Sequence, residues 1–160
     1  MSRFSCLGVW IAMIIWTAQV SAQTVPTDRD GLEKTEGLGM AMAAEMNGYP
    51  GPKHVLELKD SLNLSQEQIK HVQTFFEDMR QEALALGKAI ISAEENLNDA
   101  FRSGRMTEDS LRVQSTEIGK LRGQLRAVHL GAHLRTKVML TELQLDNYMR
   151  LRGHVKHAHH

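Results

Sequence analysis

The side chains of this chain that are best suited to chemistry are histidines. His129 and His133 stand four residues apart, which places both imidazoles on one face of a helix, about one turn from each other. Two neutral imidazoles in that arrangement can chelate a first-row metal. A tight site needs one or two more ligands, so the pair is interpreted either as a solvated helix flank, which we favour, or as part of a metal site.

Two further groups of residues have metal-binding chemistry. Met40, Met42 and Met46 form a Met-x-Met-x-x-x-Met run, and thioethers suit Cu(I). The favoured interpretation is an adaptable apolar segment, since methionine also packs on irregular surfaces. The C-terminal segment 154–160 contains four histidines and forms either a loose site for Zn or Ni or a polar tail.

The sequence offers little for catalysis or for binding nucleic acid. Its one cysteine, Cys6, and both tryptophans lie within residues 1–22. We find no G-x-S-x-G elbow and no phosphate-binding loop, and the serines and threonines of interest stand at expected helix starts. The formal net charge is +0, whereas a nucleic-acid binder usually carries a basic excess. We therefore expect a protein that is not an enzyme and has no nucleic-acid partner.

Residues 1–22 have the order of a secretory signal peptide. An arginine precedes an apolar run, and the small residues Val20-Ser21-Ala22 supply a cleavage site before Gln23. The apolar run is about ten residues long, half of what a membrane-spanning helix needs. This pattern predicts export to the periplasm, where ATP is absent.

The rest of the chain is predicted to be all-α. Residues 23–48 form an expected flexible leader, residues 49–153 a helical domain and residues 154–160 the tail. Heptad spacing predicts one long helix from Ser65 to about Arg102 and a second that begins after Thr107. The connection at Ser103-Gly104 is short, so we expect the two to form an antiparallel hairpin, with short flanking helices that include one from Pro52 and one from Thr141 to about Arg152.

A two-helix hairpin cannot bury every apolar side chain. The expected seam comprises Ile69, Val72, Phe76, Met79, Ala83, Leu86, Ile90, Ala93, Leu97 and Ala100 on the first helix, and Leu111, Gln114, Ile118, Leu121, Leu125, Val128, Ala132, Arg135 and Met139 on the second. Phe75, Leu84, Ile91 and Phe101 lie off this seam. With the basic Arg122 and Arg126 nearby, they are the predicted surface for a short helix, a second subunit or a client protein.

One short motif occurs twice, as Leu64-Ser65-x-x-Gln68 and as Leu140-Thr141-x-x-Gln144. Ser65 and Thr141 are good N-caps, and a glutamine three residues later completes a capping box in each case. Leu64 and Leu140 precede the caps and can form hydrophobic staples with Ile69 and Leu145.

The two motifs, in a secreted helical chain whose one cysteine lies in the signal segment, resemble the Spy/CpxP family of periplasmic proteins. The resemblance covers about Tyr49 to Gly153, including Tyr148 and the "LRG" that follows the second motif. Members usually have proline where this chain has Glu142, and both residues suit the first turn of a helix.

The resemblance implies a cradle-like homodimer that acts as an ATP-independent chaperone or stress-response protein for unfolded or misfolded envelope proteins. It also implies a membrane sensor kinase as a partner, and no cofactor. The alternative, from relatives in metal resistance, is a sensor or buffer of Zn, Ni, Co or Cu. In that case His129 and His133 would be ligands, joined by residues such as His54, Glu57, Glu67 or His71.

Overall fold

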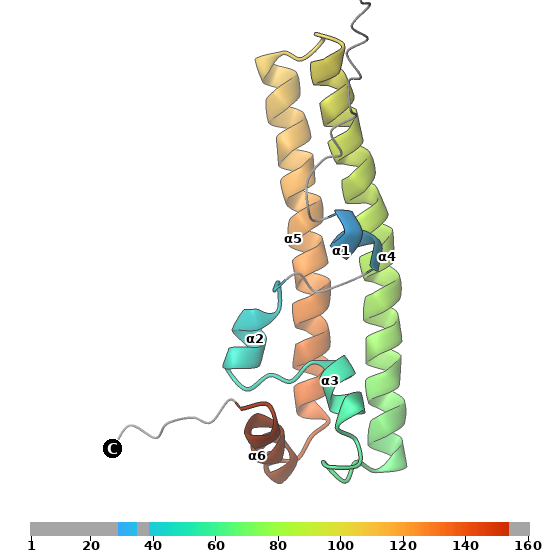
Figure 1. Ribbon diagram of the computed structural model, residues 1–160, viewed down its shortest axis with the longest axis vertical. Helices are drawn as coiled ribbons and strands as arrows, with labels where there is room; N and C mark the ends of the chain where they lie inside the picture. The colour runs from blue at the N-terminus through green and yellow to red at the C-terminus, as the bar shows by residue number, and fades with distance from the viewer. Residues whose placement is uncertain (1–28, 35–38, 154–160) are drawn as a thin grey trace, which may run out of the picture.

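Two long antiparallel helices dominate the chain (Figure 1), in a computed structural model that describes residues 29–34 and 39–153. Helix α4 (Gln66–Arg102) packs along α5 (Glu108–Val138), as predicted. All the regular elements of the described residues are helices, which confirms the all-α class. None of the described helices has an apolar stretch long enough to cross a membrane. The expected signal peptide (1–22) and tail (154–160) lie outside the described residues.

The turn between the long helices follows from residues 103–107. Gly104 has a positive φ of 66°, a conformation that glycine adopts without steric penalty after a helix C-terminus. Arg105 N then donates to the carbonyl of Ala100, which satisfies an acceptor of the last turn of α4. Thr107 Oγ1 accepts a hydrogen bond from Ser110 N and so caps α5, as predicted.

The heptad seam holds the hairpin together. Its buried members are Val72, Met79, Ala83 and Ile90 of α4 and Ile118, Leu125 and Ala132 of α5. Two predicted seam positions of α5 are polar and half-buried. Gln114 Oε1 and Arg135 Nε are buried without a hydrogen-bond partner, so the seam is less favourable at these two positions.

Three short helices gather at the end of the hairpin where α4 begins and α5 ends (Figure 1): α2 (Met42–Met46), α3 (Pro52–Glu57) and α6 (Glu142–Leu151). One core cluster forms here from Val55 of α3, Val72 of α4 and Tyr148 of α6, together with Leu62, Leu64 and Leu140 of the connecting segments. Leu64 and Leu140 are therefore buried next to the two capping boxes, with Ile69 and Leu145 packed against the same cluster.

A fourth short helix, α1 (Arg29–Lys34), lies against α4 nearer the middle of the hairpin (Figure 1). Leu32 is buried in a second core cluster with Ala83, Ile90 and Leu125. The segment 23–48 was expected to be a flexible leader, yet its described part supplies two helices, and α1 packs on the hairpin. A single leucine in a polar stretch carries no periodicity, and so its burial has no signature in the sequence.

Both predicted capping boxes are present. Ser65 Oγ accepts from Gln68 N, and Ser65 N donates to Gln68 Oε1 at 2.9 Å. Thr141 and Gln144 repeat this exchange, with 3.0 Å from Thr141 N to Gln144 Oε1.

The two glutamines of the repeated motif also bond to each other. Gln68 Nε2 donates to Gln144 Oε1 at 2.8 Å, and Gln144 Nε2 lies 3.2 Å from Gln68 Oε1. Each amide also reaches a backbone carbonyl beside the opposite motif: Met139 O for Gln68 and Leu62 O for Gln144. The repeat therefore forms a nearly symmetric pair that ties the start of α4 to the start of α6.

This pairing predicts that the two motifs contribute cooperatively to stability. Replacing either glutamine with alanine (Gln68→Ala or Gln144→Ala) removes one capping box and the inter-motif bonds together, so each change should lower the free energy of unfolding by about 1–3 kcal/mol. The double variant should lose less than the sum of the two by about 0.5–1 kcal/mol, because the shared bonds are lost only once. Urea unfolding followed by circular dichroism measures all three.

The matched control is Gln124→Ala, an exposed glutamine on α5, which should change stability by less than about 0.5 kcal/mol. Strict additivity of the two motif substitutions would show that the caps act independently.

Candidate functional site

The seam divides the surface of the hairpin into two flanks. In a heptad repeat with seam residues at positions a and d, positions e and b lie on one side and positions g and c on the other. One side, here named the covered flank, carries Gly87, Glu94, Arg122, His129, His133 and Thr136. Arg122 pairs with Glu94 across the helices at 2.8 Å, which shows that these positions face the same way.

The N-terminal segments lie over the covered flank. The backbone of Leu32 in α1 approaches Gly87, and the carbonyl of Tyr49 contacts His133. The opposite side, here named the open flank, carries Phe75, Val113, Leu134 and Val138. Val113, Leu134 and Val138 are exposed.

The structure brings five of the six predicted client-binding residues to the covered flank: Leu84, Ile91, Phe101, Arg122 and Arg126. Phe101 and Arg126 are exposed, while the other three are half-buried. Ile91 packs against the cluster that contains Leu32 of α1. Part of the predicted client surface is therefore occupied by the protein's own N-terminal segment.

Phe75 is separate from the other five because it lies at position g, on the open flank. The guanidinium carbon of Arg135 lies 5.4 Å from the centre of its ring, and the ring of His71 lies 6.4 Å away. An arginine stacked on an aromatic ring leaves less of that ring available to a client.

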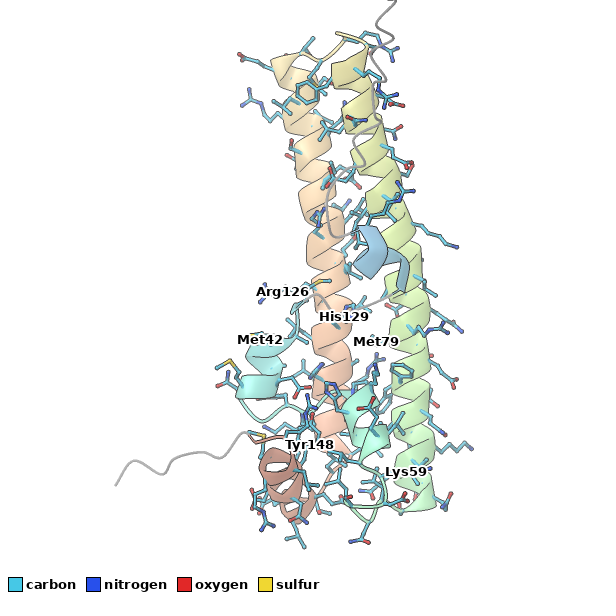
Figure 2. The ribbon with its side chains drawn as sticks, viewed as in Figure 1. Met42, Lys59, Met79, Arg126, His129 and Tyr148 are labelled. Carbon is cyan, nitrogen blue, oxygen red and sulfur yellow. The ribbon has the colours of Figure 1, made fainter. Side chains whose placement is uncertain are left out.

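His129 and His133 are buried, with only 5% and 7% of their surfaces exposed. The interpretation of this pair as a solvated flank is therefore wrong. Residues 49–52 fold back across α5 near His133, and Pro50, Gly51 and Pro52 are themselves buried. Figure 2 shows His129 on α5 at the level of Met79 on α4.

Backbone carbonyls determine which nitrogen of each imidazole carries a proton. His129 Nδ1 lies 2.9 Å from Leu125 O, and His133 Nδ1 lies 2.8 Å from Tyr49 O. A carbonyl oxygen only accepts, so both Nδ1 atoms donate, and the Nε2 of a neutral ring keeps its lone pair. His129 Nε2 is buried and has no hydrogen-bond partner. Among the described residues, no three or more His, Cys, Asp or Glu side chains come together as a metal site would require.

Glu45 is the centre of a polar cluster that joins α2 to three other parts of the fold. Its Oε1 accepts from His54 Nδ1 at 3.0 Å and from Gly51 N at 3.3 Å, and its Oε2 accepts from the Tyr148 hydroxyl at 2.9 Å. His133 Nδ1 lies 4.0 Å from Oε1. We name Glu45, His54, His133 and Tyr148 the Glu45 cluster. In Figure 2, Tyr148 points from α6 toward the region between α2 and α3.

The surroundings of Glu45 shift two ionisations. Burial by itself would raise the pKa of the Glu45 carboxyl, but the hydrogen bonds from His54 and Tyr148 and the electrostatic effect of the nearby His133 and His54 rings outweigh it, so this pKa lies below its ordinary value. Burial and the adjacent Glu45 carboxylate raise the pKa of Tyr148 well above its ordinary range. Glu45 is therefore a charged acceptor and Tyr148 a neutral donor at neutral pH.

The Glu45 cluster was not found from the sequence. The partners of Glu45 are nine residues away at His54 and 103 residues away at Tyr148, and no local pattern connects them. Gly51 is a partial signal. A Cβ there would lie 2.9 Å from His133 Cε1 and 3.1 Å from Glu45 Oε1, so glycine at this position provides room for the cluster. With donors on both oxygens, the Glu45 carboxylate ties α2 to the start of α3 and to α6, beside His133 of α5.

Comparison of the chain with models of protein families, with curated proteins and with solved structures finds no match in any of the three. The resemblance to the Spy/CpxP family therefore stays a prediction from the repeated motif and the hairpin.

The Glu45 cluster predicts a dependence of stability on pH. The folded-state pKa of Glu45 lies below its ordinary value of 4.5, so the carboxylate contributes stability that is fully present above that pH. This contribution is lost as the pH falls through the folded-state pKa. The substitution Glu45→Gln should cost about 1–3 kcal/mol at pH 7, and this difference from the unsubstituted protein should shrink below pH 4.5. Urea unfolding at pH 7, 5, 4 and 3 measures it.

Glu57→Gln is the matched control, because Glu57 is an exposed carboxylate of neighbouring α3. It should change stability by less than about 0.5 kcal/mol at pH 7. A difference between Glu45→Gln and the unsubstituted protein that stays constant from pH 7 to 3 would contradict the assignment of charge to Glu45.

Proposed function

We propose that this protein is an ATP-independent periplasmic chaperone that holds partly unfolded envelope proteins and limits their aggregation. The observation that supports the proposal best is the open flank. Val113, Leu134 and Val138 are 69%, 56% and 81% exposed, on a face of α5 that no other described element covers. Leu134 and Val138 stand one helical turn apart on this face, and Val113 stands further along it, beyond Glu117, Lys120 and Gln124. Neighbouring exposed apolar side chains such as Leu134 and Val138 suit an interaction surface.

The form of this surface suits weak and unspecific holding. Its apolar side chains are spread along a helix of 31 residues and do not line a deep pocket, so an extended client segment can make several small contacts. Burying each valine or leucine contributes only about 1–3 kcal/mol before the costs of ordering the client are subtracted. Release would then need no nucleotide, as the periplasmic location requires.

The resemblance adds two partners to this proposal. A second copy of the chain would form a cradle-like homodimer, and the open flank offers surface for that contact as well as for clients. A membrane sensor kinase is the regulatory partner that the family implies. The proposal contains no catalytic step: the hydroxyls of Ser65, Thr107 and Thr141 are engaged in caps, and the Glu45 carboxylate is engaged by its donors.

The proposal predicts that mature protein (residues 23–160) suppresses aggregation of a urea-unfolded, tryptophan-containing client diluted into buffer. Suppression should be unaffected by EDTA or by added Zn, Ni or Cu. The double variant Val113→Asp/Leu134→Asp should need about fivefold more protein for half suppression, because losing roughly 1 kcal/mol of contact energy changes affinity by that factor. Light scattering gives the suppression curve, and client tryptophan fluorescence gives binding, since both tryptophans of this chain lie in residues 1–22.

Ser115→Asp is the control, because it adds a charge at an exposed position of α5 that is not on the open flank. If the unsubstituted protein leaves client aggregation unchanged at equimolar concentration, the chaperone proposal fails. Equal suppression by the double variant would instead remove the open flank from the mechanism.

A metal-responsive sensor or buffer is the second candidate, and the tautomers of His129 and His133 favour it. Backbone carbonyls hold both rings in the form whose Nε2 accepts a metal, an arrangement common around metal-ligating histidines. The pair supplies two donors, and among the described residues no group of three or more His, Cys, Asp or Glu side chains is arranged to hold a metal ion. The chain's own donors therefore fit an incomplete site better than a closed tetrahedral one.

If this candidate is correct, Zn, Ni, Co or Cu binds with one-to-one stoichiometry in calorimetry, and His129→Ala or His133→Ala weakens binding by about tenfold or more. The measurement uses a chain whose tail histidines 154, 157, 159 and 160 are changed to alanine, which removes loose binding there. His71→Ala, an exposed histidine of α4, should leave the affinity unchanged. Unaltered binding in the His129 and His133 variants would exclude this pair as ligands.

A further inference from the structure

Helix α1 occupies a specific place on the covered flank. Leu32 is 4% exposed and packs with Ala83, Ile90 and Leu125, and Leu86, Ile91 and Leu121 border the same cluster. The contact joins a helix of only six residues to the long hairpin. So short a helix has little stability of its own, and the surface of α4 and α5 must stabilise it.

Gly87 is what allows α1 to approach. A Cβ built on Gly87 would lie 2.6 Å from the backbone oxygen of Leu32, closer than any real Cβ contact. Glycine inside a helix makes the helix less stable than alanine would, by about 1 kcal/mol, so Gly87 is unfavourable for α4 itself. The close approach of the α1 backbone is the structural reason for glycine at this position.

Charge adds a second element of recognition. Arg29 Nη1 lies 2.7 Å from Glu95 Oε1, two turns along α4 from Gly87. Arg29 and Leu32 stand three residues apart, so one turn of helix presents a cation to Glu95 and an aliphatic side chain to the apolar cluster. An exposed ion pair is weak by itself, and here it fixes the direction of a segment whose leucine is already buried.

We propose that this surface, named the α1 surface and lined by Ala83, Gly87, Ile90, Ile91, Glu95 and Leu125, is a docking site for client segments, and that α1 is their intramolecular competitor. The matching segment carries an arginine or lysine three residues before an aliphatic residue and presents its backbone to Gly87. This inference rests on the proposed chaperone function for its client. It explains why predicted client-binding residues such as Ile91 lie beside the protein's own helix.

Competition has a measurable consequence. When α1 is docked for nine-tenths of the time, a client that needs the same surface binds about tenfold more weakly than it would to the bare surface. Releasing α1 without changing the α1 surface should therefore strengthen client binding. Blocking the surface with a Cβ at Gly87 should release α1 and still give no gain.

The first experiment measures release of α1 by hydrogen exchange with mass spectrometry on the mature chain. Leu32→Asp, Leu32→Ala and Gly87→Ala should each raise exchange at residues 29–34. Gly119→Ala is the matched control, since it replaces a helical glycine whose Cβ would meet nothing within 4 Å. Unchanged exchange in Gly87→Ala would overturn the proposed role of Gly87.

The second experiment tests the α1 surface without any client. A fluorescent peptide of residues 27–36 is titrated by anisotropy into full-length mature Leu32→Asp protein. The proposal expects saturable binding to Leu32→Asp and about tenfold weaker binding to Leu32→Asp/Gly87→Ala. A peptide with Arg29 and Leu32 changed to alanine should not bind. Equal binding to both proteins, or none to either, would overturn the docking site.

The third experiment measures client affinity by fluorescence. Leu32→Asp and Leu32→Ala should bind client about three- to tenfold more tightly than the unsubstituted chain, and Gly87→Ala should not. Release of α1 with no gain in client affinity would overturn the competition. If no variant binds client while the peptide binds the α1 surface, the chaperone proposal and the role of this surface for clients both fail, and the surface is a docking site for α1 alone. Thermal unfolding by circular dichroism shows that each variant is folded.

Discussion

The Gln68–Gln144 pair is the interaction on which the arrangement of this protein most depends. Each glutamine side chain completes the cap of its own helix and bonds to the other motif, so two helices whose capping glutamines stand 76 residues apart share one hydrogen-bond network. This network fixes the start of α6 against the start of α4. Tyr148 then reaches Glu45 from α6, Glu45 holds α2 and α3, and the segment between those helices covers His133. A repeated local motif thus determines contacts well beyond its own residues.

Much of the fold could be predicted because its signals are local. Seam residues repeat every three or four positions, and capping residues stand three apart. The hairpin, its turn and both capping boxes therefore follow from short stretches of sequence. Pairing between the two capping boxes did not follow, although the repetition of Gln68 as Gln144 was visible. Capping explains each motif alone, and only the three-dimensional structure shows that each side chain has donors and acceptors left for the other.

The candidate site was harder to predict, since its members are single residues that act over long distances. Glu45 and Leu32 stand in a segment of low periodicity. Each contacts at least one residue that is more than fifty positions away in the sequence, such as Tyr148 for Glu45 and Ile90 for Leu32. The heptad pattern did place His129 and His133 on a flank, but it does not say whether a flank is covered. Heptad positions separate Phe75 from Leu84, Ile91 and Phe101, so that division of the predicted client surface was available from the sequence.

The two flanks differ in how their apolar side chains are treated: some of those on the covered flank lie under other segments, and most of those on the open flank are exposed. A two-helix hairpin buries only its seam, so apolar side chains elsewhere must be covered by another segment or remain exposed. On the covered flank, the contacts of α1 with the hairpin include the buried Leu32 and the exposed Arg29–Glu95 ion pair, whereas α2 and α3 are joined by the charged Glu45 cluster. The free energies of detachment should therefore differ along the same flank. The Glu45 cluster joins several elements at the end of the hairpin, whereas exchange of α1 nearer its middle is what we propose. A weakly held cover would protect apolar surface from self-association and still release it to a stronger partner, which the proposed chaperone, acting without nucleotide, would require.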